Sequence, residues 1–163
     1  MNRQRGKTAS ILYVVFVLSS EYYGTDMKDS YRVLPMDALI RVSHMPPFLK
    51  GVVNLRGVSV PVLDLRTRLD LPKTRQTAES RIVIASTAGQ YIGFIVDAVT
   101  GVSPIPTSSI NEAPVSEVRS NYLSGTATLG PRQVFLIDLN KVSSLFDGRI
   151  LATPANDEPA PVR

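Results

Sequence analysis

The sequence predicts an all-β protein made of two small barrels packed together, with a short helix near the C-terminus. Three observations support this class. Short runs rich in Val, Ile, Tyr and Phe alternate with turns rich in Gly, Pro and Ser, which is typical of β-strands. One pattern of strands occurs twice along the chain. Only the segment LNKVSSLFDG, residues 139–148, has the apolar spacing of a full helical element.

The first elements are a basic tail and a strand. Arg3, Arg5 and Lys7 make residues 1–9 a basic segment, which we expect to be flexible. The apolar run ILYVVFVL at 11–18 predicts the first strand. A basic segment before a short apolar run also occurs in signal peptides, but the following SSEYYG offers no small-residue cleavage site. No run reaches the ~18 apolar residues of a transmembrane helix, so we expect no membrane insertion.

Two pairs of stretches match each other without gaps. GVVNLRGVSVPVLDL at 51–65 matches GTATLGPRQVFLIDL at 125–139, and YVVFVLSSEYYG at 13–24 matches IVIASTAGQYIG at 82–93. Each half therefore holds a hairpin near its start and a strand–turn–strand unit near its end. Halves of about seventy residues bury little core alone, so the two barrels should pack on each other. The polar segment 72–80 is the predicted linker between the halves.

Two helical elements are expected. A short helical turn should follow Leu65, which has the spacing to share a face with Leu69. For the C-terminal helix we expect an N-cap at Asn140, a stop at Gly148 and a buried face made of Val142, Leu145 and Phe146. Residues 151–163 are rich in Pro, Ala and charge, and we predict that they are disordered.

The residue inventory argues against an enzyme. The chain has no cysteine, so it has neither a thiolate metal site nor a cysteine nucleophile, and any Ser-His-Asp triad would need its single histidine, His44. Asp64, Asp97 and Asp138 each end an apolar strand and could form a carboxylate cluster for acid–base chemistry or metal binding. Turn formation or helix capping is the favoured interpretation, because Asp64 and Asp138 are repeat equivalents. We expect no catalytic residue, no cofactor and no metal.

The repeat also separates residues that the architecture needs from residues that it does not need. Both copies keep the first glycine, a leucine and an alternating strand that ends in Asp-Leu. Asn54 and Arg56 are not kept, because Thr128 and Gly130 stand at the matching places. They could be a solvated polar pair of a hairpin. A functional role is better supported, because an arginine in a loop offers a planar, permanently charged fork for a partner's carboxylates or carbonyls.

The stretch PPFLKGVVNLRGVSVPVLDLRTRLDL, residues 46–71, resembles the signature of the CheW-like domain family of bacterial chemotaxis adaptors. YIGFIVDAVTGV at 91–102, YLSGTATL at 122–129 and VFLIDLNKV at 134–142 are similar to the second half of that family, in the same order. The resemblance spans nearly the whole chain and implies one CheW-like domain over residues 10–150. It also implies two intertwined, five-stranded SH3-like barrels.

The resemblance further implies a function. Members of the family are non-enzymatic scaffolds that link the cytoplasmic tips of methyl-accepting chemoreceptors to a CheA-type histidine kinase. Such a protein is expected in the cytoplasm, at receptor arrays near the inner membrane. The arginine of the N-L-R-G block belongs to the family's receptor-binding surface, which here implies Arg56 with Asn54, and Gly51 on the same face. The kinase docks on apolar barrel ends, whose residues the resemblance does not identify.

The chain departs from the family pattern between Gly24 and Val33. It has Thr25 for an apolar residue, Ser30 at the family's valine position and Arg32 at its glutamate position. Because this strand borders the family's receptor groove, the change from acid to base reverses the local charge, and we add Arg32 to the receptor-binding candidates. The receptor is then unusual, or the pathway is a chemosensory system for surface sensing or pili.

A basic β-barrel that binds nucleic acid is a third class of function. Residues 50–81 hold seven basic and three acidic side chains, which could form a phosphate-contacting face. Nucleic-acid binders usually interleave such a face with aromatic residues, whereas the aromatic residues here lie in apolar runs. We therefore expect no nucleic acid among the partners.

Overall fold

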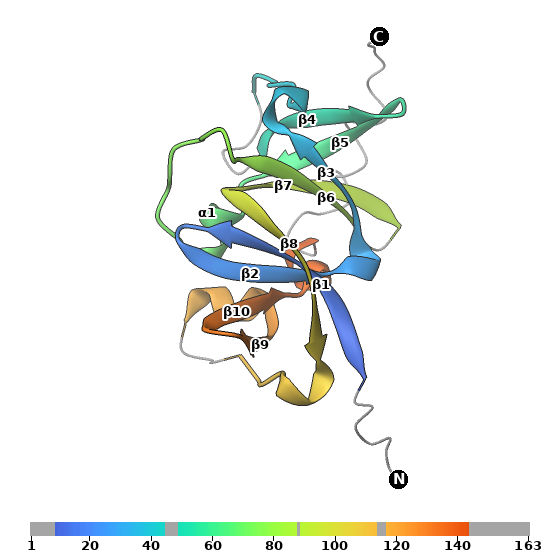
Figure 1. The fold of residues 1–163 in the computed structure, drawn as a ribbon. Coiled ribbons are helices and arrows are strands. Elements are labelled where there is room, and N and C mark those ends of the chain that lie inside the picture. The colour runs from blue at the N-terminus through green and yellow to red at the C-terminus, as the bar shows by residue number, and fades with distance from the viewer. Residues whose placement is uncertain (1–8, 45–48, 88, 114–116, 144–163) are drawn as a thin grey trace.

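The structure is a computed structural model that describes residues 9–44, 49–87, 89–113 and 117–143. In this part of the chain, ten strands form two five-stranded sheets with only short helices beside them (Figure 1). The predicted all-β class with two five-stranded units is confirmed.

The first sheet contains, in the order of hydrogen bonding, β8 (Ala98–Pro106), β1 (Ser10–Leu18), β2 (Glu21–Asp26), β10 (Arg132–Ile137) and β9 (Leu123–Leu129). The second sheet contains β3 (Ser30–Pro35), β6 (Arg81–Thr87), β7 (Gln90–Val96), β5 (Val58–Leu63) and β4 (Leu49–Leu55). The hairpins β1–β2 and β6–β7 and the strand–turn–strand units β4–β5 and β9–β10 are those that the repeat predicts.

The two repeats exchange strands. In the first sheet, the opening hairpin β1–β2 of the first repeat lies between β8 and β10 of the second repeat. In the second sheet, the opening hairpin β6–β7 of the second repeat lies between β3 and β5 of the first repeat. Each barrel is therefore built from both halves of the sequence, which is why Figure 1 shows early and late colours side by side in the lower sheet.

Two of the four strand pairs that join the repeats are parallel. Gly24 of β2 pairs with Leu136 of β10, and Gly93 of β7 pairs with Val62 of β5. A Cβ atom on Gly93 would lie 3.0 Å from the Ile84 side chain and 3.2 Å from that of Val62. The repeated glycine therefore makes room for the strand that the other repeat contributes.

The predicted linker 72–80 connects the first repeat to the second, but it does not connect one sheet to the other. It leads from α1 (Leu65–Leu69) to β6, and both β5 and β6 belong to the second sheet. The sequence halves and the barrels are thus different divisions of the chain, because each half gives its first two strands to one sheet and its last three to the other.

The largest buried cluster joins the two sheets. Phe16 of β1 and Phe94 of β7 are fully buried, and their ring centroids lie 5.5 Å apart. Tyr23 of β2 stacks on the other side, with its ring centroid 6.4 Å from that of Phe16. Fully burying an aromatic or aliphatic side chain of this size contributes about 1.5–3 kcal/mol. The two barrels therefore pack on each other, as predicted, and they do so through a shared aromatic core.

The two short helices follow equivalent strands. In α1, Leu65 and Leu69 are both buried, as their spacing predicts. The second helix, α2 (Leu139–Ser143), begins two residues earlier than an N-cap at Asn140 predicts. Asp138, not Asn140, caps it, because the Asp138 carboxylate accepts a hydrogen bond of 2.9 Å from the Asn140 backbone amide.

Several predictions lie outside the described residues. These are the flexible basic segment before residue 9, the continuation of the C-terminal helix beyond residue 143 and the disordered tail 151–163. No helix in the described part of the chain is long and apolar enough to cross a membrane.

Candidate functional site

Arg56 occupies the first position of the two-residue turn between β4 and β5. Leu55 and Val58 are paired across the ends of the strands, so that Arg56 and Gly57 alone form the loop. Their φ angles are 53° and 87°, as a type I′ hairpin turn requires. Asn-Gly and Gly-Gly are the residues that suit this turn, because both positions lie in the left-handed region.

The backbone at Arg56 is costly for an arginine. A residue with a Cβ atom loses roughly 1 kcal/mol in the left-handed region. The repeat equivalent Gly130 has a φ of 63° and avoids this cost. The fold therefore builds a two-residue connection, Gly130-Pro131, at the matching place without an arginine. The Arg56 side chain is exposed at the tip of its own hairpin.

Asn54 has a structural role in the same turn. Its side-chain Oδ1 accepts a hydrogen bond of 2.8 Å from the backbone amide of Gly57. This bond is local and does not involve Arg56, so Asn54 holds the turn that presents the arginine. Direct contact between Asn54 and a partner stays a prediction.

Gly51 is explained by the fold itself. It is buried at the other end of β4, and a Cβ atom there would lie 2.3 Å from the carbonyl oxygen of Ile40. Its equivalent Gly125 would place a Cβ atom 2.6 Å from the carbonyl oxygen of Asn111. At both places a single residue outside the named strands, Ile40 or Asn111, forms an isolated β-bridge with the strand at the edge of the barrel. Any partner contact at Gly51 has to be made by the backbone, and that contact stays a prediction.

Arg32 is exposed on β3, the strand at the opposite edge of the second sheet from β4. Strand pairing places it beside Ile84 of β6. In the other repeat, Val15 of β1 matches Ile84 and pairs with Gly101 of β8 at the same irregularity of strand register, which makes Gly101 the equivalent of Arg32. The fold does not need a basic residue at this place.

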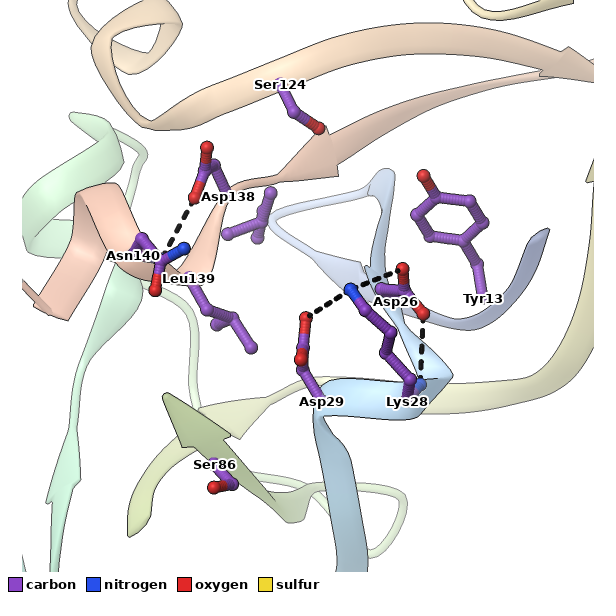
Figure 2. Close-up of a pocket in the computed structure, with 10 residues that line it drawn as sticks. Tyr13, Asp26, Lys28, Asp29, Ser86, Ser124, Asp138, Leu139 and Asn140 are labelled. Atoms are coloured by element: carbon purple, nitrogen blue, oxygen red, sulfur yellow. Dashed lines mark hydrogen bonds and ion pairs between the residues drawn. The ribbon is translucent and has the colours of Figure 1, made fainter. Parts of the chain in front are cut away.

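A polar cleft of about 450 Å³ lies between the two barrels (Figure 2). In Figure 2 the side chain of Lys28 lies between those of Asp26 and Asp29, with Nζ–Oδ2 distances of 3.3 and 3.6 Å. The wall combines hydroxyl and carboxylate groups from both sheets and from α2, contributed by Tyr13, Asp26, Lys28, Asp29, Ser86, Ser124, Ile137, Asp138, Leu139 and Asn140.

The electrostatics of the polar cleft keep two of its side chains protonated. Burial raises the pKa of Tyr13, and the neighbouring charge of Asp26 raises it further. The hydrogen bond that Lys28 donates to Asp26 raises the pKa of Lys28. Near neutral pH both groups therefore keep their protons, so that the tyrosine is a hydrogen-bond donor and not a base. The sequence could not reveal this cleft, because its residues come from five separate segments and only Asp138 and Asn140 are singled out individually by the sequence.

The three strand-end aspartates do not form one cluster. Asp64 and Asp97 meet across the buried guanidinium of Arg66, which pairs with both carboxylates. Asp64 also caps α1 by accepting a hydrogen bond of 3.0 Å from the Arg66 backbone amide. Asp138 caps α2 and lines the polar cleft instead. Among the described residues, no group of three His, Cys, Asp or Glu could hold a metal ion. The capping interpretation of Asp64 and Asp138 is confirmed.

Together these features define a duplicated double-barrel protein whose unusual residues lie on exposed turns and strands. The model of the CheW-like domain matches residues 12–146, and the chain belongs to that family.

Individual relatives agree with this assignment. The chain is 30% identical over 146 residues to the chemotaxis protein CheW of Klebsiella aerogenes, with 88% of each chain covered. It is 36% identical over 101 residues to the chemotaxis protein CheW of Bacillus subtilis, covering 62% of this chain and 65% of that protein. The scaffolding protein TtCheW from Thermoanaerobacter tengcongensis has a similar structure, with a TM-score of 0.73 and 35% identity over 79% of this chain and 89% of that chain.

Proposed function

We propose that the protein is a non-enzymatic scaffold that couples the cytoplasmic tips of methyl-accepting chemoreceptors to a CheA-type histidine kinase. Membership of the CheW-like family supports this function, as does the name of the similar scaffolding protein. Binding to both partners would hold the protein at receptor arrays beside the inner membrane, without inserting into it.

The observation that carries the proposal is the conformation of Arg56. An exposed arginine in the left-handed region lowers the stability of the fold, and the other copy of the repeat avoids this loss by having glycine there. Strained residues of this kind are concentrated at functional sites. A guanidinium at the tip of a rigid hairpin can make two parallel hydrogen bonds to a carboxylate or carbonyl pair on the receptor. In this account Asn54 and Gly51 support the surface and Arg32 extends it.

Coupling is tested by three-way co-sedimentation. A vesicle-anchored receptor cytoplasmic fragment, the kinase and this protein are mixed, and the kinase in the pellet is measured with and without the protein. We expect the kinase to pellet with the receptor only when the protein is present. Equal kinase in the pellet without the protein, or none with it, would contradict the coupling function.

A chemosensory pathway for surface sensing or pili is the second candidate. The observation that favours it is Arg32, an exposed base at a place where the family has an acid and where the other repeat has Gly101. The same co-sedimentation with receptors from both kinds of pathway distinguishes the two candidates.

Nucleic-acid binding is less well supported, because the cations of residues 50–81 do not share one face. Arg66 is buried in ion pairs with two aspartates, and Arg56 lies at the far end of the β4–β5 hairpin from Lys50. Binding of the protein to single-stranded DNA at low salt would support this class of function.

A further inference from the structure

A second, smaller cleft lies at the end of the β4–β5 hairpin opposite Arg56. It has a volume of about 190 Å³. Lys50 comes from the start of β4, Asp64 follows the end of β5, and Asp97 follows β7. We call it the basic cleft, and its lining residues are Arg41, Lys50, Asp64, Arg66, Lys73, Thr74, Gln76, Ser80, Ile95 and Asp97. It is distinct from the polar cleft, with which it shares no residue.

The two carboxylates of the basic cleft are already engaged within the protein. Asp97 accepts hydrogen bonds from Arg66, from the Thr74 hydroxyl at 2.9 Å and from the Ser19 backbone amide at 2.8 Å. Asp64 accepts from the backbone amide of Arg66 at 3.0 Å. Because a carboxylate has about four lone-pair sites and Asp97 accepts three hydrogen bonds, little acceptor capacity is left on Asp97 for the other cations.

Among the described residues, the remaining cations of the cleft have one long ion pair and no hydrogen bond to a carboxylate. Lys50 Nζ lies 3.9 Å from Asp64 Oδ2, which is too far for a hydrogen bond. Arg41 and Lys73 are exposed, and no ion pair joins either to a carboxylate within the described ranges. In the wall behind them, the Nε of the buried Arg66 has no acceptor among the described residues. The cleft therefore has more positively charged donors than acceptors.

We propose that the basic cleft binds one oxyanion, supplied by the carboxylate of an acidic side chain on a partner protein. Lys50 of β4, Arg41 and Lys73 of the 72–80 segment line the same cleft and together complement a single negative group. None of the described lining residues carries an aromatic ring on which a nucleic-acid base could stack, and the volume suits a side-chain head group. The partner is the receptor or the kinase, and in this respect the inference rests on the proposed function.

Two variants only two residues apart give a matched test. Lys73→Gln removes a charge from the cleft, whereas Arg75→Gln removes the same charge from an exposed residue of the same segment that does not line the cleft. Inorganic phosphate is first titrated into each protein and followed by backbone-amide NMR. Association rates with the receptor fragment and with the kinase are then measured at low salt and at about 0.5 M salt, where charges are strongly screened.

We expect saturable phosphate shifts at residues 73–76 in the wild type and in Arg75→Gln, and their loss in Lys73→Gln. We also expect Lys73→Gln to slow association with one of the two partners by roughly fivefold at low salt, with the difference disappearing at high salt. Phosphate shifts that rise linearly without saturation, or equal rate losses in both variants, would overturn the proposal.

Two further outcomes are decisive. Saturable phosphate binding with unchanged association rates for both partners would show a site for a free anion, contradicting the assignment to a partner's carboxylate. If the wild type binds neither partner, the proposed function fails. In that case, loss of the saturable phosphate shifts in Lys73→Gln would still support the oxyanion site. Retention of these shifts in Lys73→Gln would overturn the oxyanion site as well.

Discussion

The carboxylate of Asp97 accepts a hydrogen bond of 2.8 Å from the backbone amide of Ser19, and so joins the end of β7 in the second sheet to the β1–β2 turn of the first. The same carboxylate pairs with Arg66, which is 6% exposed. One aspartate thus connects the two barrels and neutralises a buried cation. Removing one partner of a buried ion pair leaves the other charge uncompensated, which is costly.

Asp97→Ala should therefore destabilise the protein by about 3 kcal/mol. Urea unfolding measures the loss, and Asp37→Ala, at an exposed residue of the 3-10 turn η3 (Met36–Ala38), is the control, with an expected change within about 0.5 kcal/mol. Equal midpoints for the two variants would show that the Asp97 network does not hold the barrels together.

Gly93→Ala should destabilise the protein by about 1–3 kcal/mol, because the new methyl group would press on Ile84 and Val62 in the parallel pair. Its equivalent Gly24 has more room, since a Cβ atom there would be 3.4 Å from the nearest side-chain atoms. Gly24→Ala should cost less than about 1 kcal/mol. Thermal melts of the two variants provide the comparison, and a larger loss for Gly24→Ala would contradict the packing described for the exchanged strands.

Stability should fall at alkaline pH because of Tyr23. Burial raises the pKa of this fully buried tyrosine well above its usual value of 10. The unfolded chain ionises near pH 10 while the folded protein keeps the proton, so the contribution is complete below pH 10 and is lost as the pH rises toward the folded-state pKa. The limiting slope is about 1.4 kcal/mol per pH unit. Tyr23→Phe should reduce this slope in unfolding measurements between pH 9 and 11, whereas an unchanged slope would assign the effect to other groups, such as Tyr13.

Arg32 should determine which receptor is bound. A positive side chain at the edge of a binding surface attracts an acidic partner and disfavours a basic one, with its main effect on association rate and specificity. Arg32→Glu should improve binding to a receptor from a typical chemotaxis system and weaken binding to the native receptor. Arg32→Ser, which removes the charge and keeps a small polar side chain, should fall between the two. Unchanged affinity for both receptors in both variants would show that the residue is merely exposed.

Much of the fold follows from local patterns. The apolar run of β1, the four paired strand units and the buried face of Leu65 and Leu69 were all predictable, because strand and helix periodicity are local properties. The exchange of strands between barrels was not predictable from the repeat, since a repeat does not state which unit joins which sheet. The wrong cap at Asn140 has a local cause: α2 begins two residues earlier, which gives the cap to Asp138.

The candidate site was likewise predictable only in part. The internal comparison with Gly130 singled out Arg56 from the sequence, but its left-handed conformation is visible only in the structure, because Arg-Gly is not a typical type I′ pair. The structural reasons for Asn54 and Gly51 depend on contacts with Gly57 and Ile40. Both clefts were missed, since their walls combine residues from distant segments.

The central claim is that Arg56 serves binding and not folding, and Arg56→Asn tests it most directly. This substitution creates an Asn-Gly pair, which suits the type I′ turn better than Arg-Gly does, while removing the guanidinium. The variant should therefore melt at or above the wild-type temperature. Arg56→Lys is the matched control, because it keeps the charge and loses only the planar fork.

The measurement is the affinity of Arg56→Asn for the receptor cytoplasmic fragment, taken beside its affinity for the kinase and its thermal melt. We predict a loss of more than about 2 kcal/mol in receptor binding, with kinase binding and stability retained. A variant that unfolds early would show that the arginine is structural. A variant that folds and binds the receptor as tightly as the wild type would contradict the role assigned to Arg56.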